Sequence, residues 1–175
     1  MRMRKKPNLG VRMERCTRVL ISDPEERKGK WRELMPVAKQ IWLELGCGKG
    51  RFTAEMAEQH ADVLYIAVER VPDAMVIAME RCAEKKLTNV FFVDGDAARL
   101  RDYFAPGEVD RLFINFCDPW PSNHHARRRL THKNFLVLYR GVLKDGERST
   151  LRRITGTCLN TLCFSSPRRG IRCRR

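Results

Sequence analysis

The chain alternates between short apolar runs and amphipathic segments, and turns rich in glycine, proline or acids separate them. Apolar runs too short for amphipathic helices predict four buried strands, within residues 41–45, 63–68, 89–93 and 109–116. Apolar residues at helical spacing predict a helix after each strand, within residues 52–60, 72–82, 100–104 and 131–143. Strands that alternate with helices through short turns predict an α/β fold, with a parallel sheet and helices on both of its faces.

Two further predictions concern the chain ahead of the first strand. Asp23 offers an N-cap and Pro24 suits the first helical position, which predicts a helix from there to Met35. Residues 1–10 are basic and lack apolar periodicity, so we expect them to be extended, and we assign residues 1–22 to a basic N-terminal arm. Such an arm either frays or contacts phosphates.

The first strand runs into three glycines at alternate positions, Gly46, Gly48 and Gly50. A backbone without Cβ atoms lets a ligand approach closely, although a plain structural turn is the alternative. The dinucleotide-binding pattern G-x-G-x-x-G has its third glycine one residue later, and Glu44 would repel a pyrophosphate. A carboxylate suits a ligand with a cationic centre and an amino group, such as S-adenosylmethionine (SAM). The E-x-G-x-G-x-G pattern resembles the nucleotide loop of Rossmann-like class I methyltransferases.

Acidic residues follow successive predicted strands at the edge where ligands bind to open parallel sheets. Glu69 is placed to accept both ribose hydroxyls of the cofactor. Asp96 can accept from the adenine amino group, while the backbone N–H of Ala97 donates to the ring. Asp118 lies past the fourth strand, where the methyl group would point. One such carboxylate could be a solvated or capping residue, but three after successive strands predict a SAM site.

The segment Asp118-Pro119-Trp120-Pro121 looks like a variant of the [DN]-P-P-[FYW] loop, by which nucleic-acid methyltransferases hold a planar base. Asp118 would accept from N–H groups of the base, and Trp120 would offer a stacking face worth ~1–3 kcal/mol. A rigid turn with a buried tryptophan is the alternative. The basic residues that follow, Arg127, Arg128 and Arg129, would contact phosphates if they lie at the mouth of the site, and otherwise form a solvated face.

Composition narrows the class of protein. The 175 residues suit a single domain, and no apolar run approaches the ~20 residues of a membrane span, so we expect a soluble, cytoplasmic protein without a membrane partner. Seven cysteines without a C-x-x-C pair indicate reduced thiols rather than a zinc site or disulfides, and we expect no metal. A formal net charge of +14 favours a polyanionic partner such as nucleic acid.

Several motifs together are similar to those of the bacterial tRNA (guanine-N7)-methyltransferases: M-R-M-R-K-K-P, L-E-L-G-C-G-K-G, V-E-R, D-G-D-A, and N-F-C-D-P-W-P followed by R-R-R-L-T. The resemblance covers residues 1–146. It implies SAM contacts from Glu44, Glu69 and Asp96, an active-site role for Asp118, and the variable-loop guanine of tRNA as the substrate. The family usually has a basic residue directly after the D-P-W-P turn, whereas this chain has Ser122 and Asn123.

The sequence changes character after Gly146. Residues 147–175 contain eight arginines, one acid and no lysine, and they lack a strand period, although a class I sheet needs further strands here. Synonymous codons exist for which the frame one nucleotide earlier reads G-A-I-H-F-K-T-D-N-R-D-L-F-E-Y, which resembles the next strand of the family. We therefore expect residues 147–175 to be out of frame and disordered, and the methyltransferase domain of residues 1–146 to lack its last strands.

Three functions stay open at this point. The first is transfer of a methyl group from SAM to guanine N7 in tRNA, the second is SAM-dependent methylation of another base or of a small molecule, and the third is RNA or SAM binding without catalysis. The sequence leaves open whether this chain is active. It also leaves open whether the protein is a monomer or a homodimer.

Overall fold

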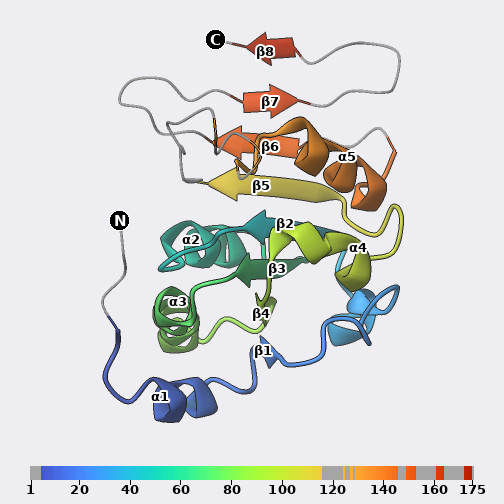
Figure 1. Cartoon of the computed structure of the whole chain (residues 1–175). Coiled ribbons are helices and arrows are strands. Elements are labelled where there is room, and N and C mark those ends of the chain that lie inside the picture. Colours follow the sequence, from blue (N-terminus) through green and yellow to red (C-terminus); the bar gives the residue numbers. More distant parts are fainter. Residues whose placement is uncertain are drawn as a thin grey trace.

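The structure, a computed structural model, describes residues 5–115, 124, 127 and 129–145, together with the backbone of residues 149–152, 161–163 and 172–174. Its centre is a six-stranded sheet with the order β1-β4-β3-β2-β5-β6, and every neighbouring pair is parallel (Figure 1). The strands are β1 (Leu20–Ile21), β2 (Gln40–Leu45), β3 (Val63–Glu69), β4 (Val90–Asp94), β5 (Arg111–Asn115) and β6 (Ser149–Arg152). The predicted parallel sheet is therefore confirmed.

Helices cover both faces of this sheet, also as predicted. They are α1 (Leu9–Arg15), α2 (Arg51–Gln59), α3 (Pro72–Glu84), α4 (Leu100–Tyr103) and α5 (Lys133–Val142), with the 3-10 helices η1 (Trp31–Leu34) and η2 (Ala97–Arg99). Two apolar clusters lie on opposite faces: α4, α5 and η1 contribute to one, and α2 and α3 contribute to the other. Alternate residues of β3 serve the two clusters, Leu64 and Ile66 in the first and Tyr65 and Ala67 in the second.

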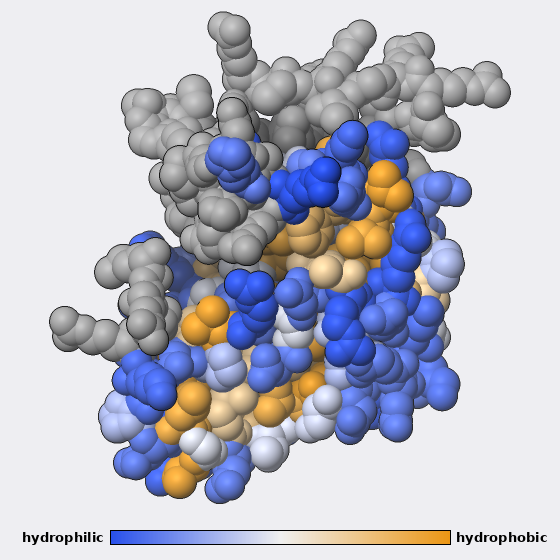
Figure 2. Space-filling model, in the orientation of Figure 1, coloured by the Kyte–Doolittle hydropathy of each residue, from blue (hydrophilic) through white to orange (hydrophobic). Residues whose placement is uncertain are grey.

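Burial on both faces explains why the strands appear in the sequence as continuous apolar runs. Every residue of β3 is buried, and β2 is buried from Ile41 to Leu45. Some apolar surface also reaches the outside, where Val137 of α5 is 56% exposed. Figure 2 shows hydrophobic surface over the region of α5 and again near α1.

The helix predicted from Asp23 to Met35 was wrong in extent. The backbone N–H groups of Glu26 and Arg27 donate to carbonyls three residues back, and Gly29 has a φ of +77°. Glu108, far along the chain, accepts from the N–H groups of Gly29 and Trp31 at 3.0 and 3.3 Å. These tertiary bonds leave a turn followed by the short η1.

The predicted N-terminal arm is folded from Leu9 onwards, so Leu9 and Gly10 are helical and not extended as predicted. Helix α1 packs on α3, and the Arg12 guanidinium donates to both carboxylate oxygens of Glu80 at 2.6 and 2.5 Å. Leu9 and Met13 add to the apolar cluster under α3. Strand β1, which is too short to predict from its sequence, then pairs with β4.

Part of the segment predicted to be out of frame joins the fold. The backbone of β6 pairs with β5 in the main sheet, and β7 (Thr161–Cys163) and β8 (Arg172–Arg174) form a separate antiparallel pair. The rest of residues 147–175 lies outside the described residues, and so does the prediction of disorder for it.

Candidate active site

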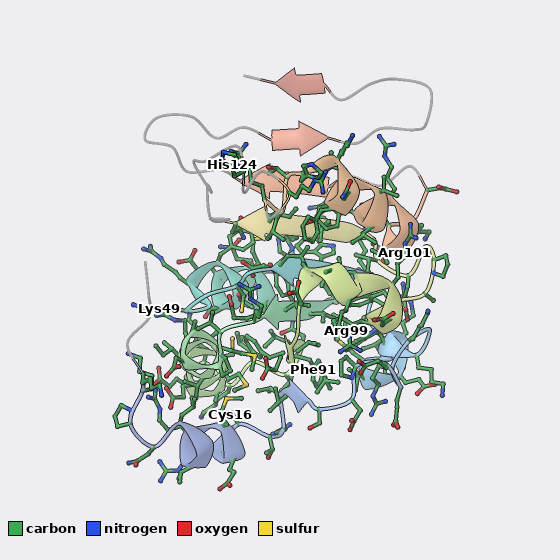
Figure 3. All side chains as sticks on the ribbon, viewed as in Figure 1. Cys16, Lys49, Phe91, Arg99, Arg101 and His124 are labelled. Carbon is green, nitrogen blue, oxygen red and sulfur yellow. The ribbon has the colours of Figure 1, made fainter. Side chains whose placement is uncertain are left out.

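The central strands of the sheet end at a common edge, because they run parallel. Leu45 at the end of β2 lies beside Val68 of β3 and Ile114 of β5. Glu69 at the end of β3 lies beside Asp94 of β4. Lys49, in the glycine turn after β2, lies at the same edge (Figure 3).

The three glycines of the turn all have positive φ angles, of +72° at Gly46, +56° at Gly48 and +67° at Gly50. A Cβ atom added at Gly46 or Gly48 would meet no atom within 4 Å, so the turn faces open space at these two positions. At Gly50 the added atom would lie 2.4 Å from the Cβ of Ala78 in α3. The first two glycines therefore leave room for a ligand, and the third lets α2 pack on α3.

The Glu69 carboxylate holds the turn against the start of α3. One oxygen accepts from the N–H of Gly48 at 2.8 Å, and the other accepts from the N–H groups of Arg70 and Val71, each at 2.9 Å. The residue is only 9% exposed. A carboxylate has about four lone-pair positions, so these three bonds leave Glu69 able to accept from one hydroxyl group.

Asp96 and Ala97 follow β4 at the same edge. The Asp96 carboxylate caps η2 by accepting from the N–H of Ala98 at 2.9 Å, and its other oxygen lies 3.5 Å from the Arg70 guanidinium. Arg70 directly follows Glu69, so the ends of β3 and β4 are linked through side chains. The Asp96 side chain is 44% exposed, and Ala97 is buried.

Glu44 lies beneath the turn rather than at its surface, because its exposed fraction is 1%. One carboxylate oxygen accepts from the hydroxyl groups of Thr53 and Tyr65 at 2.7 and 3.1 Å, and the other accepts from Asn115 Nδ2 at 2.8 Å. Burial raises the pKa of Glu44, and the three donors oppose this effect. The predicted contact between Glu44 and the cofactor stays a prediction.

The three donors to Glu44 were not identified from the sequence. Thr53 lies in α2, Tyr65 in β3 and Asn115 at the end of β5. Only Asn115 left a signal in the sequence, since it is a polar residue near the end of the apolar run of residues 109–116, at the ligand-binding edge. The pairing of the donors with Glu44 depends on the fold.

The other predicted site residues are only partly described. Asp118, Trp120 and Arg128 lie outside the described residues. Arg127 is exposed, and Arg129 is half-buried.

Neither a reactive thiol nor a metal site accompanies this edge in the part of the chain that the structure describes. Cys47 of the turn is buried, and burial together with the nearby Glu44 raises the pKa of its thiol well above the usual value. No group of three or more histidine, cysteine or acidic residues in the described ranges could hold a metal ion.

None of the described helices has the length and apolar character that crossing a bilayer requires.

Comparison with known proteins places this edge in a family. Residues 38–152, from the approach to β2 through β6, match a family model described as "Putative methyltransferase". The tRNA (guanine-N(7)-)-methyltransferase of Bacillus cytotoxicus is 43% identical over 148 residues, which are 84% of this chain and 68% of that protein. The same enzyme of Geobacillus thermodenitrificans is 41% identical over the same shares. The chain belongs to the tRNA (guanine-N7)-methyltransferase family.

Solved structures agree with this family at the level of the fold. The antibiotic-resistance methyltransferase Kmr aligns with a TM-score of 0.58 and 21% identity, over 82% of this chain and 67% of that one. A 16S rRNA (adenine(1408)-N(1))-methyltransferase from Catenulisporales acidiphilia, solved with SAM, aligns with a TM-score of 0.53 and 20% identity, over 74% and 61%. The resemblance drawn from the sequence motifs is confirmed, and the family is SAM-dependent.

Proposed function

We propose that this member of the tRNA (guanine-N7)-methyltransferase family transfers the methyl group of SAM to N7 of a guanine in the variable loop of tRNA. The observation that carries the proposal is the open space in front of Gly46 and Gly48, at the edge where Glu69 and Asp96 follow neighbouring strands. The relatives with 43% and 41% identity are named tRNA (guanine-N(7)-)-methyltransferase. A tRNA substrate is consistent with the net charge of +7 that residues 1–146 carry once residues 147–175 are set aside, and with the predicted cytoplasmic location.

The residues of the edge fit the groups of SAM. The backbone at Gly46 and Gly48 lets the cofactor approach, Glu69 accepts from the ribose, and Asp96 accepts from the adenine amino group. The N–H of Ala97 donates to the adenine ring. Glu44 is buried beneath the glycine turn, and it supports the part of the turn that receives the cationic end of SAM.

The chemistry requires positioning rather than a strong base. Guanine N7 has an in-plane lone pair and no proton to lose, so its attack on the sulfonium methyl forms the C–N bond as the C–S bond breaks. Bound SAM supplies this electrophilic methyl group. Asp118 holds the N–H edge of the guanine and offsets the positive charge that grows on the purine, while Trp120 stacks on the base. Arg127, Arg128 and Arg129 contact phosphates.

Replacing Asp118 with alanine tests this assignment. We expect turnover to fall by about 10²–10³-fold, because a group that opposes charge growing in the transition state is removed. The Kd of SAM should change little, since cofactor binding rests on the residues after β2, β3 and β4. N7-methylguanosine formed in tRNA is measured by mass spectrometry, and SAM binding is measured by calorimetry.

Asp102, an exposed acid of α4, provides the matched control, and Asp102→Ala should keep wild-type turnover. Unchanged turnover in Asp118→Ala would refute the role of Asp118. A wild-type chain that binds SAM but methylates no RNA would support the non-catalytic alternative. Methyl transfer to another base or to a small molecule would support the other one.

A further inference from the structure

Gly95 lies between the end of β4 and Asp96, and its N–H donates to the Glu69 carbonyl at 3.2 Å. Its backbone lies outside the left-handed region, so the local conformation does not require a glycine. A Cβ atom added there would lie 2.8 Å from the hydroxyl oxygen of Tyr103, and 3.0 and 3.1 Å from two carbons of its ring. The missing side chain at Gly95 therefore lets the phenol of Tyr103 lie directly against this loop.

Tyr103 is the last residue of α4, and several contacts fix its position. It is buried in the apolar cluster that α4 and α5 share. The guanidinium carbon of Arg99 lies 5.4 Å from the centre of its ring, and its carbonyl accepts from the indole N–H of Trp31 at 2.8 Å. A tyrosine held in this way offers the loop a rigid surface, because its ring cannot turn away without disturbing the cluster.

The hydroxyl group of Tyr103 meets the backbone that carries Asp96. Burial raises the pKa of this hydroxyl, whereas the nearby Arg99 and a hydrogen bond from the backbone N–H of Asp96 oppose the effect. The Asp96 carboxylate itself is partly exposed, and it accepts from the N–H of Ala98. A buried residue therefore holds the backbone of a residue whose side chain faces the candidate site.

We propose that Tyr103 is a positioning residue for the recognition of the adenine ring. Its phenol fixes the backbone around Gly95 and Asp96, so that the Asp96 carboxylate stands where it accepts from an amino group. This inference rests on the proposed function, because it takes the adenine of SAM as the group that Asp96 binds. Hypoxanthine has a carbonyl oxygen in place of the amino group, and two facing acceptors repel each other. The loop should therefore favour adenine over hypoxanthine.

The test compares two stable ligands that differ only in the base, S-adenosylhomocysteine and S-inosylhomocysteine, by calorimetry. The wild-type chain should prefer the first by at least about 10-fold. In Tyr103→Phe, which removes only the hydroxyl group, we expect this preference to fall at least about threefold. Gly95→Ala should lower it as well, because the new Cβ atom displaces the phenol. A general loss of stability would weaken the binding of both ligands alike and leave their ratio unchanged.

Phe104→Leu provides the matched control. Phe104 is buried, follows Tyr103 in the chain and stacks on Trp31 with 5.0 Å between the ring centres. This variant loosens the same cluster but keeps the phenol, so we expect a lower Tm and a wild-type preference. Asp96→Asn tests the route of the effect, since an amide can donate to the hypoxanthine carbonyl. Tyr103→Phe added to Asp96→Asn should lower the preference no further.

Three results would overturn the proposal. The first is a Tyr103→Phe variant with the wild-type preference, and the second is a Phe104→Leu variant that loses the preference to the same extent. The third is a wild-type chain that binds both ligands equally, since Asp96 would then not distinguish the bases. A wild-type chain that binds neither ligand would overturn the proposed function too. One that prefers S-adenosylhomocysteine but methylates no RNA would contradict the proposed function alone.

Discussion

Gly46 and Gly50 belong to the same turn and both have positive φ angles, but their surroundings differ. A side chain at Gly46 would point into open space, whereas one at Gly50 would collide with Ala78. The same backbone conformation therefore serves ligand access at one position and helix packing at the other.

This difference predicts opposite outcomes for two alanine substitutions. Gly50→Ala should lower the free energy of unfolding by about 2–4 kcal/mol, because a left-handed backbone conformation costs ~1–2 kcal/mol for alanine and overpacking adds a similar amount. Gly46→Ala should lower it by only ~1–2 kcal/mol and weaken SAM binding at least 10-fold. Urea denaturation and calorimetry measure the two effects. Equal losses of stability would contradict the packing argument.

For single residues, the sequence indicated which of them lie near the ends of strands, but it did not indicate which groups they bind by hydrogen bonds. Glu69 and Asp96 could be predicted as part of a site because strand ends gather at one edge. That Glu69 would accept from the Gly48 N–H, or that Asn115 would donate to Glu44, could not be predicted. Such bonds join residues 21 and 71 positions apart, and only the packed sheet brings them together.

Among the elements, α1 and α3 show how the N-terminal segment is held. Arg12 and Glu80 form a two-pronged ion pair, and their side chains are 24% and 33% exposed. The hydrogen bond from Arg12 lowers the pKa of Glu80. A lowered carboxyl pKa means that the pair stabilises the fold above the ordinary pKa of 4.5 and that this stability is lost as the pH falls through the lowered value.

Replacing Arg12 with methionine should therefore have a pH-dependent effect. At pH 7 we expect the free energy of unfolding to fall only modestly, since the partly exposed pair is screened by solvent. The difference from the wild type should shrink as the pH drops below 4.5 and Glu80 takes up a proton. Denaturation of both proteins from pH 3 to 7 measures this. Arg51→Met, which removes a more exposed pair with Glu55, is the control. A difference that does not change with pH would contradict the assignment to Glu80.

Elements were predictable where the pattern was local. The strands β2 and β3 and the helices α2 and α3 follow apolar runs and helical spacing, because both faces of the sheet are covered. The segment from Asp23 to Met35 carries good helix-start signals, but Glu108 binds its backbone and the indole of Trp31 donates to the Tyr103 carbonyl. Contacts from 72 to 79 positions away decided its conformation.

In the whole molecule the sheet separates two apolar clusters, one on each of its faces. The candidate site lies at the edge of the sheet where its central strands end. Glu44 points to the side of α2 and β3, where it binds Thr53 and Tyr65. Trp31 and Tyr103 lie in the other cluster. Substitutions in either cluster therefore act on the same set of strands that positions the site.

The reading-frame hypothesis also concerns the whole chain, because it compares residues 147–175 with all the residues before them. It predicts that the gene, read one nucleotide earlier from codon 146, encodes G-A-I-H-F-K-T-D-N. The reason is that residues 147–175 lack lysine and a strand period, while the preceding chain belongs to the family. Sequencing codons 140 to 175 measures this directly. Codons that cannot encode that string would end the hypothesis.

Strand β1 has only two residues, yet it occupies the outer side of β4. Without it, the backbone at Phe92 and Val93 would be an uncovered margin, ready to pair with another polypeptide. Proteolysis after the exposed Arg18 would disconnect β1 from α1, so that only its own pairing and the chain after it would hold β1 at this margin. The nicked protein should then form oligomers or precipitate, even though the residues around the glycine turn are untouched.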